Sequence, residues 1–117
     1  MQRNTEEGDG AAVHDEHRGT RYLQRWYAAH CDGEWEHECG IRMATTDNPG
    51  WHVGVDVSGT ELEGVRHPRE RRELPGGGWV IAWSDGEVFQ AACAPGSLGE
   101  VDALFERWAE SAARDGG

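Results

Sequence analysis

The densest group of chemically active side chains lies in residues 32–38, where four carboxylates flank one histidine and one tryptophan. In an extended chain, successive side chains point to opposite faces. The three glutamates would then share one face, and Trp35 and His37 would share the other. The acidic side chains of this segment are those of Asp32, Glu34, Glu36 and Glu38.

Carboxylates this close together repel one another unless a cation lies between them. We expect Arg25 or Arg42 of the same chain, or a basic residue of another protein, to fill that role. An acid–base catalytic pair would need a cleft and perturbed pKa values, which a sequence does not display. The segment is therefore interpreted as a site for a basic partner, with a solvated acidic loop ahead of a strand as the simpler alternative.

Cysteine and histidine residues lie close together in the same stretch, at His30, Cys31, His37 and Cys39. Zinc motifs pair ligands two to four residues apart on a defined turn, and this spacing matches none of them, so we expect no metal and no cofactor. No glycine-rich nest or helix start follows Cys31 to lower the pKa of its thiol. Together with Cys93 the cysteines form an odd set without a framework, which indicates reduced thiols in a cytosolic setting.

A turn sequence follows the acidic segment. In the Asp-Asn-Pro-Gly of residues 47–50, the proline presets φ for the second turn position, and Gly50 would accept the positive φ of a type II turn. Residues with a period of two flank the turn on both sides, over residues 41–46 and 51–57. This alternation predicts a β-hairpin with one buried face.

Helical spacing of apolar residues predicts one helix at residues 20–30 and another at residues 97–114. Thr20 is expected to cap the first helix, and Ser97 with Glu100 to form a capping box at the second. The remaining strands are expected at residues 65–73, 79–83 and 88–93. The order predicts an α+β fold, with an N-terminal helix, about five mainly antiparallel strands and a C-terminal helix, both helices lying on one sheet face.

The first 18 residues contain no aromatic side chain and a single large aliphatic one, Val13. Such a segment cannot offset its ordering entropy, so we expect a disordered acidic tail at residues 1–18. A single domain is expected at residues 19–114, since one core suits a chain of this length.

The chain of 117 residues carries a formal net charge of −11, from 22 acidic and 11 basic residues. All the basic residues are arginine. Negative charge disfavours nucleic-acid binding and favours a basic protein partner, although it also serves simply to keep a protein soluble. No apolar run approaches the ~18 residues of a membrane span, and no signal peptide pattern begins the chain, so we expect a cytoplasmic protein.

Two motifs in the centre of the chain are specific: Cys-Asp-Gly-x-Trp-Glu-His at residues 31–37 and Thr-Asp-Asn-Pro-Gly-Trp at residues 46–51. With shorter motifs around them, they resemble the immunity 53 family of bacterial polymorphic toxin systems, over about residues 22–109. The acidic tail, Cys39 and the glycine-rich loop at residues 76–78 depart from the family pattern. The shorter motifs are Leu-Gln-x-Trp-Tyr at residues 23–27, Gly-Ile at residues 40–41 and Gly-Thr-x-Leu-Glu at residues 59–63.

Members of that family are taken to be small cytoplasmic proteins that bind and neutralise a cognate toxin domain. The resemblance therefore implies a non-enzymatic inhibitor, and the acidic charge suits a basic toxin such as a nuclease. Tryptophan side chains would anchor the partner, and carboxylates would pair with its Arg or Lys. The predicted partner-binding residues are Asp32, Glu34, Trp35, Glu36, His37, Asp47, Asn48 and Trp51.

Two alternatives stay open. Trp35, His37, Asp47 and Trp51 could serve only to hold the loop and the hairpin in place. The chain could instead be a small enzyme or ligand-binding protein that uses Cys31, Glu36 and His37.

Overall fold

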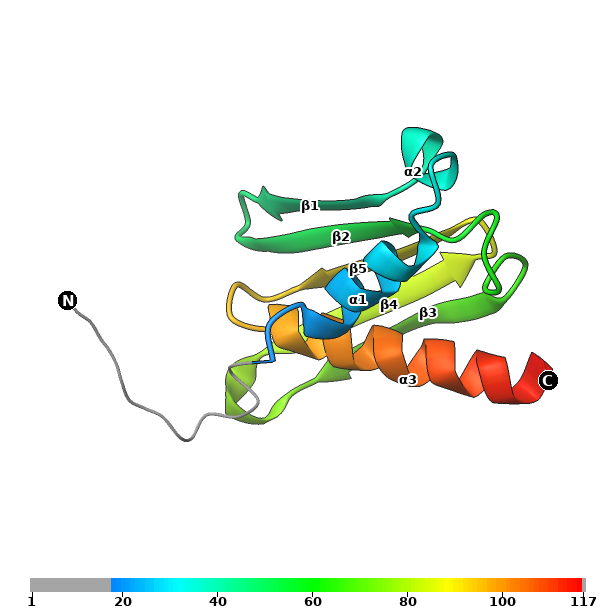
Figure 1. Cartoon of the computed structure of the whole chain (residues 1–117). Helices are drawn as coiled ribbons and strands as arrows, with labels where there is room; N and C mark the ends of the chain where they lie inside the picture. Colours follow the sequence, from blue (N-terminus) through cyan, green and yellow to red (C-terminus); the bar gives the residue numbers. More distant parts are fainter. Residues whose placement is uncertain (1–17, 117) are drawn as a thin grey trace.

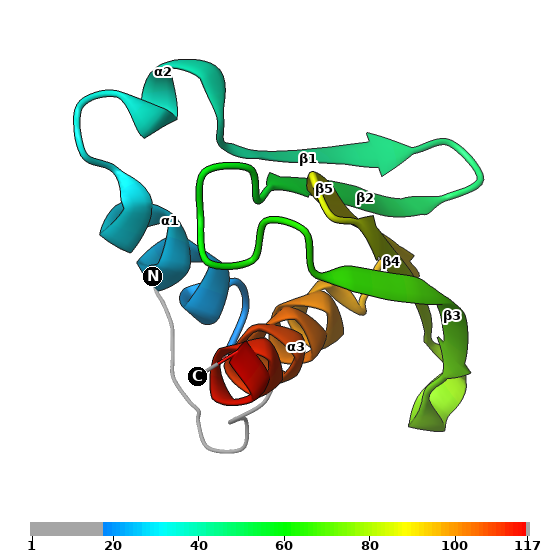
Figure 2. The same ribbon diagram turned by 90° about the vertical axis from the view of Figure 1, so that its right-hand side faces the viewer.

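A five-stranded antiparallel sheet carries two long helices on one of its faces (Figures 1 and 2). The computed structural model describes residues 18–116, so the tail predicted for residues 1–18 lies outside them except for Arg18. The helices are α1 (Arg21–His30), α2 (Trp35–Glu38) and α3 (Leu98–Gly116), with a short 3₁₀ turn η4 (Pro75–Gly77). The strands are β1 (Ile41–Thr46), β2 (Gly50–Asp56), β3 (Arg66–Glu73), β4 (Trp79–Asp85) and β5 (Val88–Cys93). The predicted α+β fold is confirmed.

The strand order in the sheet is β1-β2-β5-β4-β3. Three hairpins, β1–β2, β3–β4 and β4–β5, account for most of the pairing, and β5 joins the two halves by pairing with β2. β1 and β3 are therefore the two edges. Among the described residues, no helix is long and apolar enough to cross a membrane.

Alternate residues of β2, β4 and β5 turn toward the helices and form the core. Phe105 of α3 lies at its centre, with its ring 5.1 Å from that of Phe89 and 5.3 Å from that of Trp26. Full burial of a large apolar side chain contributes about 1.5–3 kcal/mol, so this layer holds the helices on the sheet. The fully buried side chains include Leu23, Val53, Val55, Val80, Phe89, Val101 and Phe105.

The N-terminus of α1 is capped from another helix. The carboxylate of Asp102 in α3 accepts hydrogen bonds from the backbone N–H groups of Tyr22 and Leu23. It also accepts one from the Arg18 side chain, at 2.8 Å, and Arg18 pairs with Glu106 as well. Thr20 makes no side-chain cap, so the predicted capping role is wrong. Asp102 takes the capping role in place of Thr20, because its buried carboxylate accepts hydrogen bonds from several donors at once.

The hairpin predicted around residues 47–50 is confirmed, but its turn differs from the predicted type II. Gly50 already belongs to β2, where it pairs with Thr46, and its φ is not positive. Glycine is nevertheless required there, since a Cβ atom would collide with the carbonyl oxygen of Cys93 on β5. Close approach of two strands, rather than turn geometry, selects this glycine.

The predicted strand at residues 65–73 is confirmed as β3, an edge strand with a register shift between His67 and Glu70 around Pro68. Two of its arginines lie over aromatic rings of the neighbouring strand, and Arg71 also pairs with Glu73 of β3 itself. Arg69 and Arg71 lie over the rings of Trp83 and Trp79 of β4, at 4.8 and 5.0 Å. The two arginine side chains thus cover Trp79 and Trp83 through cation–π contacts, on the face of the sheet opposite the helices.

Candidate functional site

The acidic segment folds into a helical turn, so it has neither the extended conformation considered for it nor the form of an open loop. Asp32 Oδ1 accepts hydrogen bonds from the N–H groups of Glu34 and Trp35, both at 2.9 Å. The Glu36 carboxylate reaches back to the N–H groups of Asp32 and Gly33, at 2.9 and 2.8 Å. These reciprocal bonds resemble a capping box and begin α2 at Trp35, which overrides the alternation in the sequence.

The same hydrogen bonds stabilise the negative charges of Asp32 and Glu36 and so offset the repulsion between them. Backbone N–H groups of Trp35 and then Glu34 hold the pKa of Asp32 below its usual value. The pKa of Glu36 is lowered first by its own backbone N–H and further by those of Asp32 and Gly33. Neither predicted arginine fills this role, because Arg42 pairs with Asp56 and Arg25 lies over the ring of Tyr22.

Trp35 fastens α2 to the body of the protein. Its Nε1 donates a 3.0 Å hydrogen bond to the carbonyl oxygen of Ser58. Its ring lies against Gly59, where a Cβ atom would come within 3.3 Å of Trp35 Cδ1. The ring also meets Trp26 edge to face, with centroids 5.9 Å apart. These contacts give Trp35 a structural role, whether or not a partner also touches it.

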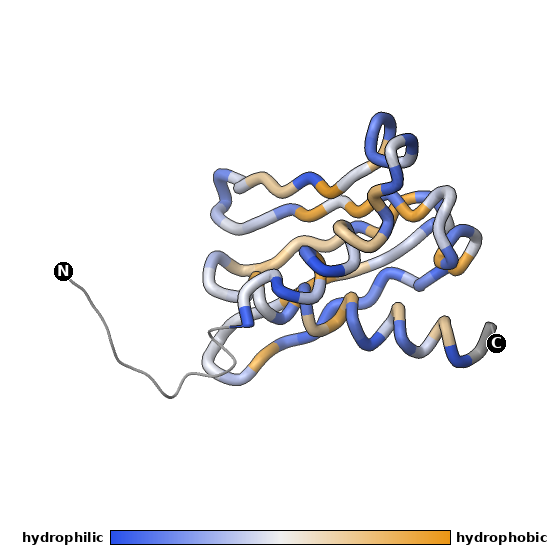
Figure 3. The backbone as a smooth tube through the Cα atoms, in the orientation of Figure 1, coloured by the Kyte–Doolittle hydropathy of each residue, from blue (hydrophilic) through white to orange (hydrophobic). Residues whose placement is uncertain are grey.

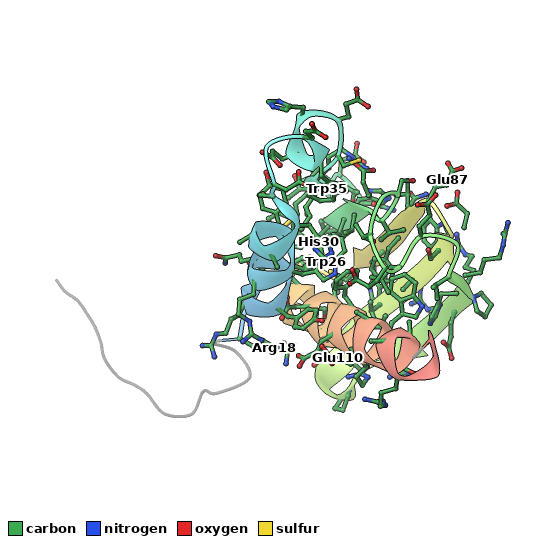
Figure 4. The ribbon with its side chains drawn as sticks, turned by 45° about the vertical axis from the view of Figure 1, so that its right-hand side comes forward. Arg18, Trp26, His30, Trp35, Glu87 and Glu110 are labelled. Atoms are coloured by element: carbon green, nitrogen blue, oxygen red, sulfur yellow. The ribbon has the colours of Figure 1, made fainter. Side chains whose placement is uncertain are left out.

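Beneath Trp35 lies a polar pair that the sequence analysis did not assign. His30 Nε2 lies 2.8 Å from Glu61 Oε1, and His30 Nδ1 lies 2.8 Å from the carbonyl oxygen of Trp26. Both ring nitrogens of His30 therefore lie within hydrogen-bond distance of an oxygen acceptor. Burial would raise the pKa of Glu61, but hydrogen bonds, led by the one from His30, outweigh it and lower that pKa. Figure 4 shows Trp35, His30 and Trp26 one above another beside α1.

The predicted site residues divide into two groups at opposite ends of β1. The Asp32–His37 group lies at its start, and Asp47 and Asn48 form the turn after its end (Figure 2). A six-residue strand is about 20 Å long, so the two groups do not form a single compact site. Trp51 donates a 3.0 Å hydrogen bond from Nε1 to the carbonyl oxygen of Pro95, which ties the hairpin to the loop before α3.

The exposed charged residues in and around α2 are acidic apart from His37, and none of their carboxylates pairs with arginine. Figure 3 shows α2 as mostly hydrophilic. Glu34, His37, Glu38 and Asp47 are exposed, and none of these carboxylates, nor Asp32 or Glu36, forms a salt bridge within residues 18–116. This leaves a fixed display of negative charge that is available to a cation from outside.

An apolar groove of about 470 Å³ runs between α1 and β1. Tyr27 and Met43 form its walls and are 36% and 37% exposed, which makes them the exposed large hydrophobic residues of the described chain. Exposed apolar side chains that line a concave surface often mark a binding site. In the sequence, Tyr27 belongs to the apolar face of the helix predicted at residues 20–30, and Met43 to the buried face of the predicted hairpin. Both were therefore expected to be buried. The groove is lined by Thr20, Leu23, Gln24, Tyr27, Gly40, Ile41 and Met43.

The residues of the enzyme alternative are already engaged or lie outside the cavities. Cys31 Sγ donates to the carbonyl oxygen of Tyr27 at 3.3 Å, and Glu36 is held by backbone N–H groups. Cys31, Glu36 and His37 do not line the groove, nor do they line three further cavities at residues 74–100, 18–107 and 67–111. No group of three potential metal ligands occurs in that part of the chain either.

Comparison with known protein families gives a match over most of the chain. The family described as Immunity protein 53 matches residues 20–110, which include all elements from α1 to β5 and most of α3. No curated protein and no solved structure matches the chain.

Proposed function

Since this chain belongs to the immunity protein 53 family, we propose that it binds a cognate bacterial toxin domain and holds it inactive. Binding rather than turnover is the basis of such protection. An inhibitor acts by covering the active site of its target or by blocking the approach of substrate.

The main observation in favour of an interaction site is the solvated group of carboxylates in α2 and just before it. Their own backbone holds Asp32 and Glu36 in place, so little side-chain entropy is lost there on binding. Glu34 directly precedes α2 and Glu38 is its last residue; both are exposed, and neither forms a salt bridge within residues 18–116. They are suited to pair with Arg or Lys of a partner.

We assign a basic partner, such as a nuclease domain, on the grounds of charge. The net charge of −11 would accelerate encounter with a positively charged protein. A row of carboxylates can occupy the groove in which a nuclease binds phosphates, so the inhibitor would compete directly with nucleic acid.

The enzyme or ligand-binding alternative has less support. A nucleophile and its base must be free to meet a substrate, and Cys31 and Glu36 are held by backbone groups outside the cavities. The family described above is likewise one of immunity proteins.

Capture of the toxin domain tests the proposal. Tagged protein is incubated with lysate of the native organism, washed at low and then high salt, and bound proteins are identified by mass spectrometry. We expect one toxin domain to resist the washes and, once purified, to lose its activity on addition of equimolar inhibitor. Failure to recover a toxin domain under toxin-producing conditions, or a recovered domain that stays active, would contradict the proposal.

Charge-neutral variants test the α2 site in the same assay. The double change Glu34→Gln and Glu38→Gln should lower the association rate and its salt dependence. Glu100→Gln, at an exposed acidic position on α3, is the matched control and should bind like the unchanged protein.

A further inference from the structure

The two edges of the sheet differ in their protection against pairing with another strand. Among the eight residues of β3 six are charged, and the strand also contains Pro68 and a register shift. Such features stop an edge from adding a further strand. The six residues of β1 include one charged side chain, Arg42, which its pairing with Asp56 already occupies. β1 is thus an edge without the usual protection.

The pairing of β1 with β2 shows which backbone groups face outward. The Gly40 carbonyl oxygen accepts a 3.0 Å hydrogen bond from the N–H of Asp56, and the register continues without interruption from Ile41 to Thr46. Hydrogen-bonded positions alternate along an antiparallel pair. Ile41, Met43 and Thr45 therefore direct their N–H and C=O groups away from β2, toward the open side of the edge.

The apolar groove lies beside those same residues. Ile41 and Met43 line it from β1, and Tyr27 lines it from α1. An extended segment that paired with β1 would place every second side chain on the groove side of the sheet. Its apolar side chains would cover Tyr27 and Met43, the large hydrophobic residues that the described chain leaves exposed.

Charge decides what kind of segment fits. Carboxylates of α2 lie before β1, and Asp47 lies directly after it. A second copy of this chain paired antiparallel along β1 would bring Glu38 of one copy toward Asp47 of the other, and the total charge of −11 on each would add to the repulsion. A segment with basic ends and an apolar centre is complementary at all three positions.

We propose that the cognate toxin adds an extended segment with basic ends to β1 as a sixth strand and inserts apolar side chains into the groove between α1 and β1. This inference rests on the proposed function. It joins the two separated groups of predicted site residues, because one strand running along β1 reaches both α2 and the turn at Asp47.

Proline at Thr45 tests the backbone part of the interface. Thr45→Pro removes an outward N–H without removing a β1–β2 hydrogen bond, whereas Thr45→Val keeps the N–H and serves as the matched control. Affinity is measured by calorimetry with the toxin domain purified from the capture experiment. We expect Thr45→Pro to weaken binding by about tenfold or more, and Thr45→Val to bind within about twofold of the unchanged protein. Thermal unfolding of each variant confirms that it is folded.

Two further measurements do not depend on that variant. Met43→Glu should weaken binding by about tenfold through the groove, with unfolding unchanged because the side chain is exposed. Hydrogen exchange on the unchanged protein should show that the toxin domain protects the amides of Ile41, Met43 and Thr45.

The outcomes separate this inference from the proposed function. If the unchanged protein inhibits the toxin but the β1 amides stay unprotected and folded Thr45→Pro binds normally, strand addition is overturned and toxin inhibition stands. If the chain instead forms dimers that Thr45→Pro dissociates, a second copy occupies the edge and the toxin assignment is wrong. If no toxin domain binds the unchanged protein, both proposals fail.

Discussion

Asp102 Oδ1 accepts a 2.8 Å hydrogen bond from the backbone N–H of Leu23, across 79 residues of sequence. Both residues are fully buried, and the second carboxylate oxygen of Asp102 serves Tyr22 and Arg18. The start of α1 is therefore held by α3. Since α1 also forms one wall of the groove beside β1, this contact positions a surface to which we assign toxin binding.

Replacing Asp102 should destabilise the whole domain. Asp102→Ala leaves the N–H groups of Tyr22 and Leu23 without their acceptor and Arg18 without a buried partner. We expect the free energy of unfolding to fall by about 3 kcal/mol, measured by urea denaturation. Glu100→Gln on the same helix should stay within about 0.5 kcal/mol of the unchanged protein. Equal stability of the two variants would show that the cap contributes nothing.

The loop between β2 and β3, which contacts Trp35, should require glycine at position 59 for two separate reasons. Gly59 has a φ of +79°, and an added Cβ would also lie 3.3 Å from Trp35 Cδ1. Gly64 has a φ of +84° with nothing within 4 Å of such an atom, so Gly64→Ala measures backbone strain alone. We expect Gly64→Ala to cost about 1 kcal/mol and Gly59→Ala clearly more, by equilibrium unfolding. A smaller loss for Gly59→Ala than for Gly64→Ala would contradict the contact with Trp35.

Acid should weaken the junction between α2 and β1 through Asp56. Its carboxylate binds the Arg42 guanidinium at 2.9 and 3.0 Å and the Gly40 N–H at 2.9 Å. The Arg42 hydrogen bonds, followed by that from Gly40, hold the pKa of Asp56 below its usual value. A lowered folded-state pKa gives stability that is present above the unfolded value of about 3.9 and is lost as pH falls through the folded value.

Comparison with Asp56→Asn isolates this carboxylate. Unfolding free energies measured from pH 7 to pH 2 should show the unchanged protein more stable than the variant at pH 7, with the difference shrinking below about pH 4. Other acidic groups titrate equally in both proteins. A difference that stays constant over the whole range would exclude a contribution from ionised Asp56.

The three free cysteines should react with thiol reagents in the order of their exposure. Cys31 is exposed, Cys39 is partly buried and Cys93 is buried. Burial raises the pKa of the Cys93 thiol to about 11, which removes the reactive thiolate at neutral pH. We expect iodoacetamide to label Cys31 first and Cys93 only after unfolding in urea, as read by peptide mass spectrometry. Labelling of Cys93 in the folded protein as fast as Cys31 would contradict the buried position of β5 in the sheet.

Local patterns predicted most elements because their periods are distinct. The alternation around residues 47–50 predicted the β1–β2 hairpin, and the helical spacing after Ser97 predicted α3 at nearly its observed start. The alternation at residues 32–38 did not show the local structure, because alternating side chains in a polar segment carry no burial that would favour a strand. There the hydrogen bonds of Asp32 and Glu36 to nearby N–H groups decided for a helical turn.

The sequence by itself determined the two long helices, the five strands, their order and the family, since periodicity and short motifs are properties of neighbouring residues. The tertiary structure alone decided that Asp102 caps α1, that Trp35 packs against Trp26 and Gly59, and that Tyr27 and Met43 line an open groove. Each of these depends on groups brought together across the fold. The physical reason is that hydrogen bonds and apolar contacts act over a few ångströms in space, without regard to separation along the chain.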